Sequence, residues 1–307
     1  MKEQRVSFFS EGVRLAGILR RPDDQAGPAP VVVQGPGWLG LADANLYVRY
    51  HQAFTDAGMS VLIFDYRGFG DSEGDRGTLS PSMQLQDLIN AVSYLTAADF
   101  VDPGAIGVFG SGGTGGGNAV LLAAADPRVK CAVSQVPVAD GADWLRRMRT
   151  PNEWAAFQDR LAADRARRVA GGEGERVHPR EEIMIPTAER RATTVKRDVD
   201  GRIPTSVPLA AADEILRYRP VDVAGLLSPR PFMVIAVAED NVTPTDHATA
   251  LYEAAGFPKK LIMQRNTTHY AAYEQYGDQV IPQIVEWFEA CFRGEAPESD
   301  EVVEVSR

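Results

Sequence analysis

Cysteine and histidine are both scarce in this 307-residue chain, which narrows the chemistry that it can carry out. The two cysteines, Cys131 and Cys291, lie far apart in the sequence and show no metal-ligand spacing. Because isolated cysteines in apolar segments are typical of buried thiols in a reducing compartment, we expect neither a disulfide nor a bound metal. The four histidines leave few candidates for acid–base chemistry near neutral pH.

Long apolar runs are also lacking, and so is an excess of positive charge. No segment approaches the roughly 20 consecutive apolar residues that a membrane-spanning helix needs, and the N-terminus is charged. The net charge of −10 weighs against a nucleic-acid or acidic-lipid partner. The arginines between residues 146 and 202 are mixed with acidic residues, as on a solvated surface. We therefore expect a cytoplasmic protein with no nucleic-acid or membrane partner, and we leave a homodimer open.

What the chain does contain is an alternation of apolar strands and helices. Its hydrophobic content of 44% and charged content of 24% are those of an ordinary globular protein. Strands and helices that alternate at this spacing predict an α/β fold with a mostly parallel, doubly wound sheet. The predicted strands are 6–9, 13–19, 31–33, 60–64, 106–109, 129–136, 232–237 and 260–264, and the predicted helices are 47–57, 80–97, 119–125 and 279–292.

The alternation is interrupted between residues 140 and 221. Strand patterns vanish there, arginine-rich helices are predicted at 144–148 and 154–170, and a loop with several glycines and prolines completes the segment. So long an insertion with its own helices indicates a helical cap over the carboxyl edge of the sheet. We therefore predict a core of residues 1–139 and 222–294, a cap of residues 140–221, and an acidic, disordered tail of residues 295–307.

A glycine-rich turn stands near the centre of the chain. Apolar Ile106, Val108 and Phe109 lead into the sequence Gly-Ser-Gly-Gly-Thr-Gly-Gly-Gly at 110–117, and a helix-forming run follows. Glycine is needed where a turn uses positive φ and where a helix passes close to a strand. The segment therefore predicts a strand, a very tight turn and a helix.

Six short motifs follow the predicted strands. They are Gly-Pro-Gly-Trp at 35–38, Asp-Tyr-Arg-Gly-Phe-Gly-Asp-Ser at 65–72, the glycine-rich turn at 110–117, Ser-Pro-Arg-Pro at 228–231, Glu-Asp-Asn-Val-Thr-Pro at 239–244 and Thr-His-Tyr at 268–270. In this order they resemble the α/β hydrolase superfamily, most closely its dienelactone-hydrolase-like and Xaa-Pro-peptidase-like branches. The resemblance covers nearly the whole chain outside the predicted cap. It implies an α/β hydrolase fold and a small-molecule substrate, and we expect no cofactor.

In that superfamily the glycine-rich turn is the nucleophile elbow, G-x-S-x-G, and here it departs from the pattern. Counting from Gly110 puts the nucleophile position on Gly112, and counting back from the glycines at 115–117 puts it on Gly113. Both registers give glycine where the family has serine. The resemblance therefore implies an elbow without its usual nucleophile.

The same resemblance implies an acid–base pair. Asp240 follows an apolar strand at the family's acid position, where a carboxylate holds an imidazole in the right tautomer. His269 follows the last predicted strand of the core, at the position of the family's catalytic base. The competing interpretations are that Asp240 caps the following helix and that His269 has only a structural role. We predict that the carboxylate of Asp240 is hydrogen-bonded to Nδ1 of His269.

An oxyanion hole is predicted beside the elbow. The family supplies one backbone N–H from the loop at 35–38, and since Pro36 has no N–H, the donor here would be Gly37 or Trp38. The residue after the nucleophile supplies the second donor, which is Gly113 in the first register. The competing interpretation is a tight turn with the Trp38 side chain in the core.

Three interpretations of the elbow remain open at the level of sequence. Ser111 or Thr114 could act as a displaced nucleophile. Alternatively no covalent nucleophile exists, and His269 and Asp240 act as an acid–base dyad. The dinucleotide fingerprint G-x-G-x-x-G also fits residues 110–115, but it is disfavoured because no acidic residue ends the next strand.

The resemblance implies an enzyme that acts on a small carbonyl compound. Hydrolysis of an ester, an amide or an activated C–C bond comes first. A non-hydrolytic acid–base reaction, as in a lyase that catalyses elimination, is the alternative. A further alternative is a catalytically dead relative that binds a ligand in the same pocket. Such a relative would have no need to keep Asp240 and His269.

Overall fold

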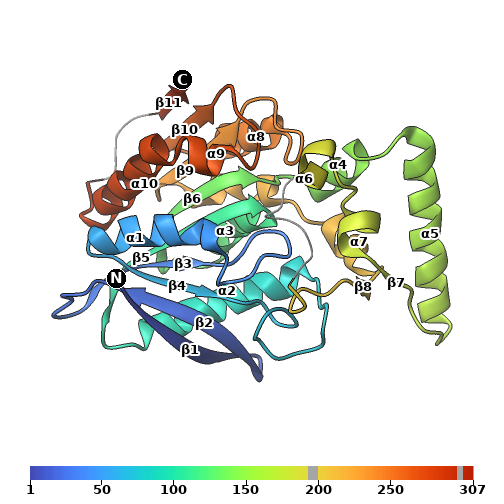
Figure 1. The fold of residues 1–307 in the computed structure, drawn as a ribbon, viewed down its shortest axis with the longest axis horizontal. Coiled ribbons are helices and arrows are strands. Elements are labelled where there is room, and N and C mark those ends of the chain that lie inside the picture. Colours follow the sequence, from blue (N-terminus) through green and yellow to red (C-terminus); the bar gives the residue numbers. More distant parts are fainter. Residues whose placement is uncertain (193–199, 296–299, 307) are drawn as a thin grey trace.

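The computed structural model describes residues 1–192, 200–295 and 300–306, and a nine-stranded sheet forms its centre (Figure 1). The strands lie in the order β1-β2-β4-β3-β5-β6-β9-β10-β11. The pairs β1–β2 and β2–β4 are antiparallel, and the other neighbouring strands are parallel. This arrangement confirms the predicted α/β hydrolase type of sheet. The strands are β1 Lys2–Ser10, β2 Val13–Arg21, β3 Ala29–Gln34, β4 Ser60–Phe64, β5 Val101–Gly113, β6 Val129–Pro137, β9 Phe232–Val237, β10 Lys259–Gln264 and β11 Asp300–Val305.

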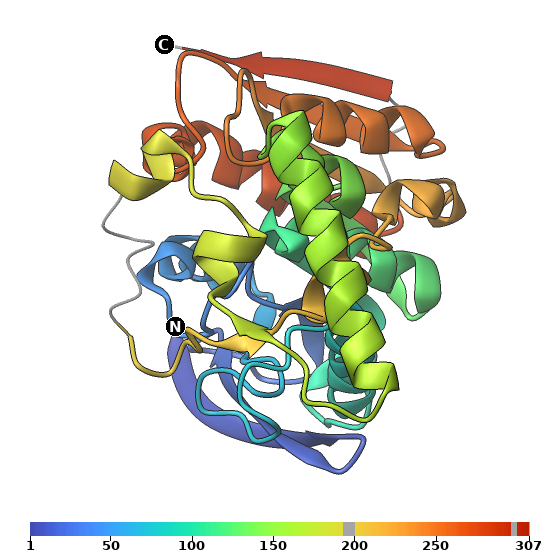
Figure 2. The same ribbon diagram turned by 90° about the vertical axis from the view of Figure 1, so that its right-hand side faces the viewer.

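Helices cover both faces of this sheet and divide the core into two layers. Helices α1 and α10 pack on one face, and α2, α3 and α8 pack on the other (Figures 1 and 2). Successive strand residues point to opposite faces, so Val31 and Val33 join one apolar cluster and Val32 joins the other. The helices outside the insertion are α1 Val48–Asp56, α2 Pro81–Thr96, α3 Thr114–Ala125, α8 Thr245–Ala254, α9 Ala272–Gln275 and α10 Gly277–Phe292, with 3₁₀ turns at Asn45–Tyr47, Pro220–Asp222 and Ala224–Leu227.

Local sequence sets the starts of two long helices. The Ser80 side chain accepts a hydrogen bond from the Met83 N–H and so caps α2, whose first residue is a proline. Thr150 and Glu153 form a reciprocal capping box at the start of the long helix α5, Pro151–Val169. None of the helices in the described residues is long and apolar enough to cross a membrane.

The segment between β6 and β9 departs from the strand–helix alternation, as predicted. The predicted helices at 144–148 and 154–170 are present as α4 and α5, and α5 crosses in front of the other elements in Figure 2. The short antiparallel pair β7–β8 within the segment was not predicted. Its elements are α4 Gly141–Arg147, α5 Pro151–Val169, β7 Arg176–Val177, a π-helical turn Pro179–Ile183, α6 Ala188–Ala192, β8 Val207–Pro208 and α7 Ala211–Ile215.

The acidic tail contains a strand, so the prediction of disorder is wrong for residues 300–305. Strand β11 lies parallel to β10 at the edge of the sheet, and the side chain of Val305 is buried. Its acidic residues find basic partners: Glu301 lies 3.0 Å from Lys260, and Glu304 lies 2.5 Å from Arg265. Charge pairing and one buried apolar side chain order a segment that its composition alone suggested was loose. Residues 296–299 and 307 of the predicted tail lie outside the described residues.

Candidate active site

Asp240 and His269 meet at the carboxyl edge of the sheet. Asp240 follows β9 and His269 follows β10, and parallel neighbours bring their carboxyl ends together. Oδ2 of Asp240 lies 2.7 Å from Nδ1 of His269, and the two side chains are 1% and 4% exposed. The predicted hydrogen bond is therefore confirmed. Because an ionised carboxylate only accepts hydrogen bonds, Nδ1 carries the proton and Nε2 is left as the basic atom.

The carboxylate of Asp240 is fixed by its own loop. Oδ1 accepts hydrogen bonds from the backbone N–H groups of Val242, at 2.7 Å, and Thr243, at 2.9 Å. The Thr243 hydroxyl donates to Oδ2 at 3.1 Å. Helix α8 begins at Thr245 without a side-chain cap, so Asp240 is not its capping residue. These contacts orient the carboxylate toward the imidazole.

Gly113 is the last residue before helix α3, a position that is consistent with the second of the two predicted registers. Gly113 has φ of 59° and ψ of −111°, and helix α3 begins at the next residue. A Cβ at Gly113 would lie 3.8 Å from Cγ2 of Thr243 and 3.8 Å from Cβ of Trp38, which is ordinary contact distance. A Cβ at Gly112 would instead face Gly37 and the hydroxyl of Tyr273. A side chain would therefore have room at either glycine, and Gly113 is the one at which the strand passes directly into helix α3.

The hydroxyls of Ser111 and Thr114 do not join His269. Ser111 is buried, and its Oγ lies 2.7 Å from the hydroxyl of Tyr273. Thr114 is buried at the start of α3, and its carbonyl accepts a hydrogen bond from Tyr218. Neither residue lines the cavity that contains His269. The arrangement therefore disfavours a displaced nucleophile.

The two predicted oxyanion donors are engaged within the protein. The Trp38 N–H donates to the carbonyl of Gly112 at 3.3 Å, and the Gly37 N–H donates to the hydroxyl of Tyr47 at 3.2 Å. In the second register the second donor would be Thr114 rather than Gly113, and the Thr114 N–H opens helix α3 without an intrahelical acceptor. The Trp38 side chain is both buried and part of the cavity wall, so the two interpretations of this loop are not exclusive.

His269 lines a small cavity of about 20 Å³. That volume is enough for a single water molecule. The insertion contributes Trp144, Arg180, Met184 and Arg190 to its wall, so this segment lies over the elbow. The remaining lining residues are Trp38, Gly112, Gly113, Val242, Thr243, His269 and Tyr270.

Two buried arginines are the feature of this site that the sequence did not predict. Burial, followed by the neighbouring charge of Arg190, lowers the pKa of Arg180 to about 10, and burial also lowers the pKa of Arg190. Arg180 donates to the Leu39 carbonyl at 3.0 Å, and Arg190 donates to the Arg180 carbonyl at 2.9 Å. Burial raises the pKa of Tyr270, the next residue along from His269, to about 12. In the sequence these two residues belong to the arginine-rich stretch between residues 146 and 202, whose mixture of basic and acidic residues is typical of a solvated surface.

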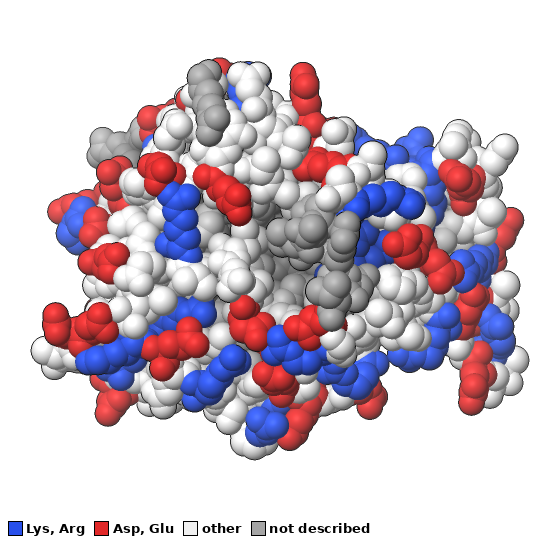
Figure 3. All heavy atoms as spheres, in the orientation of Figure 1, with Lys and Arg blue, Asp and Glu red and all other residues white. Residues whose placement is uncertain are grey.

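A second cavity of about 600 Å³ adjoins the first, because Arg180 lines both. Its walls include the apolar side chains of Leu39, Leu41 and Ile203. Acidic and basic side chains are interspersed around the hollow on this face of the molecule (Figure 3). The larger cavity is the only one of the two with space for the body of a substrate.

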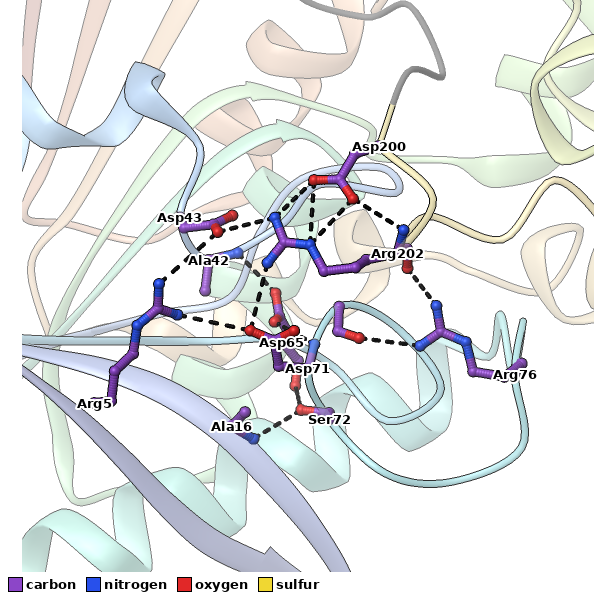
Figure 4. A network of polar contacts seen from close by, with 11 residues as sticks. Arg5, Ala16, Ala42, Asp43, Asp65, Asp71, Ser72, Arg76, Asp200 and Arg202 are labelled. Carbon is purple, nitrogen blue, oxygen red and sulfur yellow. Dashed lines mark hydrogen bonds and ion pairs between the residues drawn. The ribbon is translucent and has the colours of Figure 1, made fainter.

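An ion-pair network holds the insertion against the core beside this larger cavity (Figure 4). Arg202 lies 2.9 Å from Asp43, 2.6 Å from Asp200 and 3.4 Å from Asp71. Arg5 of β1 also contacts the core residues Asp43, at 3.9 Å, and Asp71, at 3.8 Å. Residues far apart in the sequence thus fix one wall of the cavity.

With this geometry in place, comparison with known proteins gives the family. The chain matches the X-Pro dipeptidyl-peptidase (S15 family) pattern over residues 11–271. It belongs to the S15 family. An uncharacterized 31.7 kDa Escherichia coli protein in the traX-finO intergenic region is 30% identical over 285 residues, which are 91% of this S15 chain and 96% of the relative.

Relatives with a stated activity and solved structures agree with the fold. The thiohydrolase aneE of Aspergillus aculeatus is 26% identical, with 86% of each chain covered. The crystal structure of the α/β hydrolase GrgF from Penicillium superposes with a TM-score of 0.80 at 21% identity, covering 95% of this chain and all of GrgF. The S15 chain is therefore an α/β hydrolase and an enzyme of hydrolase type that acts on small carbonyl compounds.

Proposed function

We propose that the protein hydrolyses a small ester or thioester with a water molecule that His269 activates, without an acyl-enzyme intermediate. The observation that carries this proposal is Gly113, which occupies the elbow apex without a side chain while the Asp240–His269 pair remains intact. The thioester is included because a relative of similar length is a thiohydrolase. Cytoplasmic location is part of the proposal, supported by the two cysteines being free thiols.

The roles follow from the position of each group. A water beside Gly113 gives its proton to Nε2 of His269 as it attacks the carbonyl carbon. Asp240 stabilises the imidazolium that forms. The N-terminus of α3, with the Thr114 N–H, faces the elbow and would stabilise the developing oxyanion. His269 then returns its proton to the leaving group, so the products are a carboxylic acid and an alcohol or thiol.

The insertion is part of this proposal as a cap. Its residues Trp144, Met184, Arg180 and Arg190 wall the cavity of His269, which supports exclusion of bulk water during the reaction. We keep the predicted boundaries, residues 140–221, for this cap.

A second candidate is proton transfer without hydrolysis, as in an elimination. The lack of a side chain at Gly113 favours it equally, because the dyad alone is an acid–base catalyst. A binding protein without activity is the third outcome. One set of experiments separates the three.

The test uses a panel of small esters and thioesters in H₂¹⁸O. We expect a single ¹⁸O atom in the acid product, no burst phase, and no acyl adduct by intact mass spectrometry. His269→Ala should lower kcat on the order of 10²–10⁴-fold, and His178→Ala, in the insertion and outside the cavity, is the matched control. An acyl adduct on the wild-type chain would overturn the proposal. Product without ¹⁸O indicates elimination, and turnover of no compound in the panel would contradict hydrolysis.

A further inference from the structure

The floor of the larger cavity is built from buried apolar and aromatic side chains. They come from the loop after β3, from the turn that leads into α1 and α1 itself, and from α9, and the insertion adds the half-buried Ile203. The most deeply buried of these residues, each between 2% and 5% exposed, are Leu39, Leu41, Tyr47, Tyr50 and Tyr273. Because moving apolar surface out of water onto such a floor is favourable, the floor suits an apolar ligand.

The three tyrosines of this floor have their hydroxyls bonded to the protein. The Tyr47 hydroxyl accepts a hydrogen bond from a backbone N–H of the loop after β3, at 3.2 Å. The Tyr50 hydroxyl accepts one from the side-chain amide of Gln135 at 3.1 Å, and burial raises the pKa of Tyr50 to about 12. The Tyr273 hydroxyl is hydrogen-bonded to Oγ of Ser111 at 2.7 Å. The tyrosines therefore contribute uncharged aromatic area to the floor, while their polar ends are held by the protein.

The charged side chains of the wall lie closer to solvent and form pairs. Arg202 contacts both Asp43 and Asp200, and these three side chains are 29–34% exposed, so they mark the mouth of the cavity (Figure 4). Arg49 is 47% exposed and pairs with an aspartate of α10. Among the described charged residues of the wall only Arg180 is buried, and it donates to a backbone carbonyl at 3.0 Å. A charged chain in the cavity would compete with these contacts, whereas an uncharged chain would leave them intact.

We infer that the larger cavity binds an uncharged apolar chain, which is the body of the substrate. The cavity measures about 600 Å³, and small-molecule sites in proteins have volumes of this order. Tyr273 lines it, and the centroid of the Tyr273 ring lies 6.4 Å from that of His269, so a bound chain lies close to the acid–base pair. The chain is either the acyl part of an ester or its alcohol or thiol part. Its role as part of a substrate rests on the proposed function, but its binding can be measured without turnover.

Titration calorimetry of the full chain with octanamide, an uncharged compound, tests this binding. Butanamide, which has a shorter chain, and an oligoether amide of the same length as octanamide are the comparison ligands. We expect saturable binding of octanamide, and binding of each comparison ligand weaker by at least roughly tenfold, because each buries fewer methylene groups in the cavity. No saturable binding of octanamide, or equal binding of the oligoether amide, would overturn the inference.

Two variants of the wall and two matched controls assign the binding to this cavity. Ala44→Phe places a ring in the cavity, and Ile203→Asn makes its wall polar, so each should weaken octanamide by roughly tenfold. Ala156→Phe and Val169→Asn are the controls, because both residues lie on α5, are exposed and do not line the cavity. Thermal melting verifies that each variant folds. Equal effects of the wall variants and their controls would contradict binding at this site.

The variant His269→Ala separates this inference from the proposed function. It should bind octanamide as the wild type does, even when hydrolysis is lost, and failure of all variants and of the wild type to hydrolyse any ester would count against the proposed function alone.

Kinetics with two series of esters identify the part of the substrate that the cavity holds. For the wild type, kcat/KM should rise at least roughly tenfold either from p-nitrophenyl butanoate to the octanoate or from butyl acetate to octyl acetate. The series that rises shows whether the chain is the acyl part or the alcohol part. Ala44→Phe should remove most of this rise, and Ala156→Phe should retain it. Esters that are hydrolysed with no dependence on chain length in either series would overturn the inference.

Discussion

Gly113 combines a left-handed backbone with space for a side chain. Its φ of 59° lies where L-residues are rarely found, while the built Cβ meets nothing closer than 3.8 Å. Gly110 is the opposite case, since a Cβ there would lie 2.1 Å from the carbonyl oxygen of Gly115. Glycine is thus required at Gly113 because of its dihedral angles, and at Gly110 because another part of the backbone lies too close for a side chain.

Replacing each glycine by alanine should separate the two reasons. Gly113→Ala should fold, with a loss of about 1–3 kcal/mol from backbone strain. Gly110→Ala should lose more than about 3 kcal/mol, because backbone must move. Urea denaturation measures both. Equal losses would contradict the assignment of Gly113 to the elbow apex.

His51 is a buried histidine whose partners favour the neutral ring. Burial, and then the charge of Arg20, lowers its pKa from 6.5 to about 3. Nε2 donates to Gln34 at 2.7 Å, and Nδ1 accepts from Arg20. Below pH 6.5 the unfolded chain binds a proton that the folded chain does not, so stability is full above pH 6.5 and falls as the pH drops toward 3.

The free energy of unfolding, measured between pH 7 and 5, should therefore decrease as the pH is lowered. The histidine should contribute up to about 1.4 kcal/mol per pH unit below 6.5. His51→Gln should be less stable at pH 7 but should lose that part of the slope. An unchanged slope in the variant would show that His51 does not carry the pH dependence.

At the scale of elements, Arg202 connects the insertion to two loops of the core. Its contacts with Asp43, Asp71 and Asp200 form beside the larger cavity (Figure 4). The hydrogen bond to Asp200, with smaller effects from Asp43, raises the pKa of Arg202, so it stays charged at any working pH. The side chains of Arg202, Asp43 and Asp200 are about one-third exposed and that of Asp71 is 48% exposed, so solvent screening weakens each pair.

Arg202→Ala should therefore loosen the cavity wall more than it destabilises the fold. We expect a loss of under about 1 kcal/mol in the free energy of unfolding, with faster amide hydrogen exchange at residues 200–209. The exposed Arg217 gives the control variant Arg217→Ala. High salt should reproduce the exchange pattern of Arg202→Ala in the wild type, and unchanged exchange in the variant would contradict the role of Arg202.

For the whole molecule, the strand–helix order and the acid–base pair could be predicted from the sequence, and the cavity wall could not. Apolar runs such as β3 and β9 are buried on both faces, and that pattern is local in the sequence. The roles of Arg180 and Arg190 depend on how the insertion packs on the sheet, which no local pattern encodes. β11 was missed for the same reason, because its partners Lys260 and Arg265 lie far away in the sequence.

The edge strand gives a prediction at this scale. Deletion of residues 300–307 should expose the backbone of β10, with its unpaired N–H and C=O groups. We expect a melting temperature lower by a few degrees and faster aggregation on heating, measured by light scattering. Lys260→Gln, which removes one ion pair and keeps the strand, is the control. Identical aggregation of the deleted and full chains would contradict a protective role for β11.

Arg180 has one consequence for the energetics of the whole molecule. Its guanidinium forms part of both cavity walls, so any occupant of one cavity changes the surroundings of the other. If an apolar compound in the larger cavity tightens or weakens the binding of an anion beside His269, the anion must change the affinity for that compound by the same factor. The two cavities form one thermodynamic cycle that shares a single side chain.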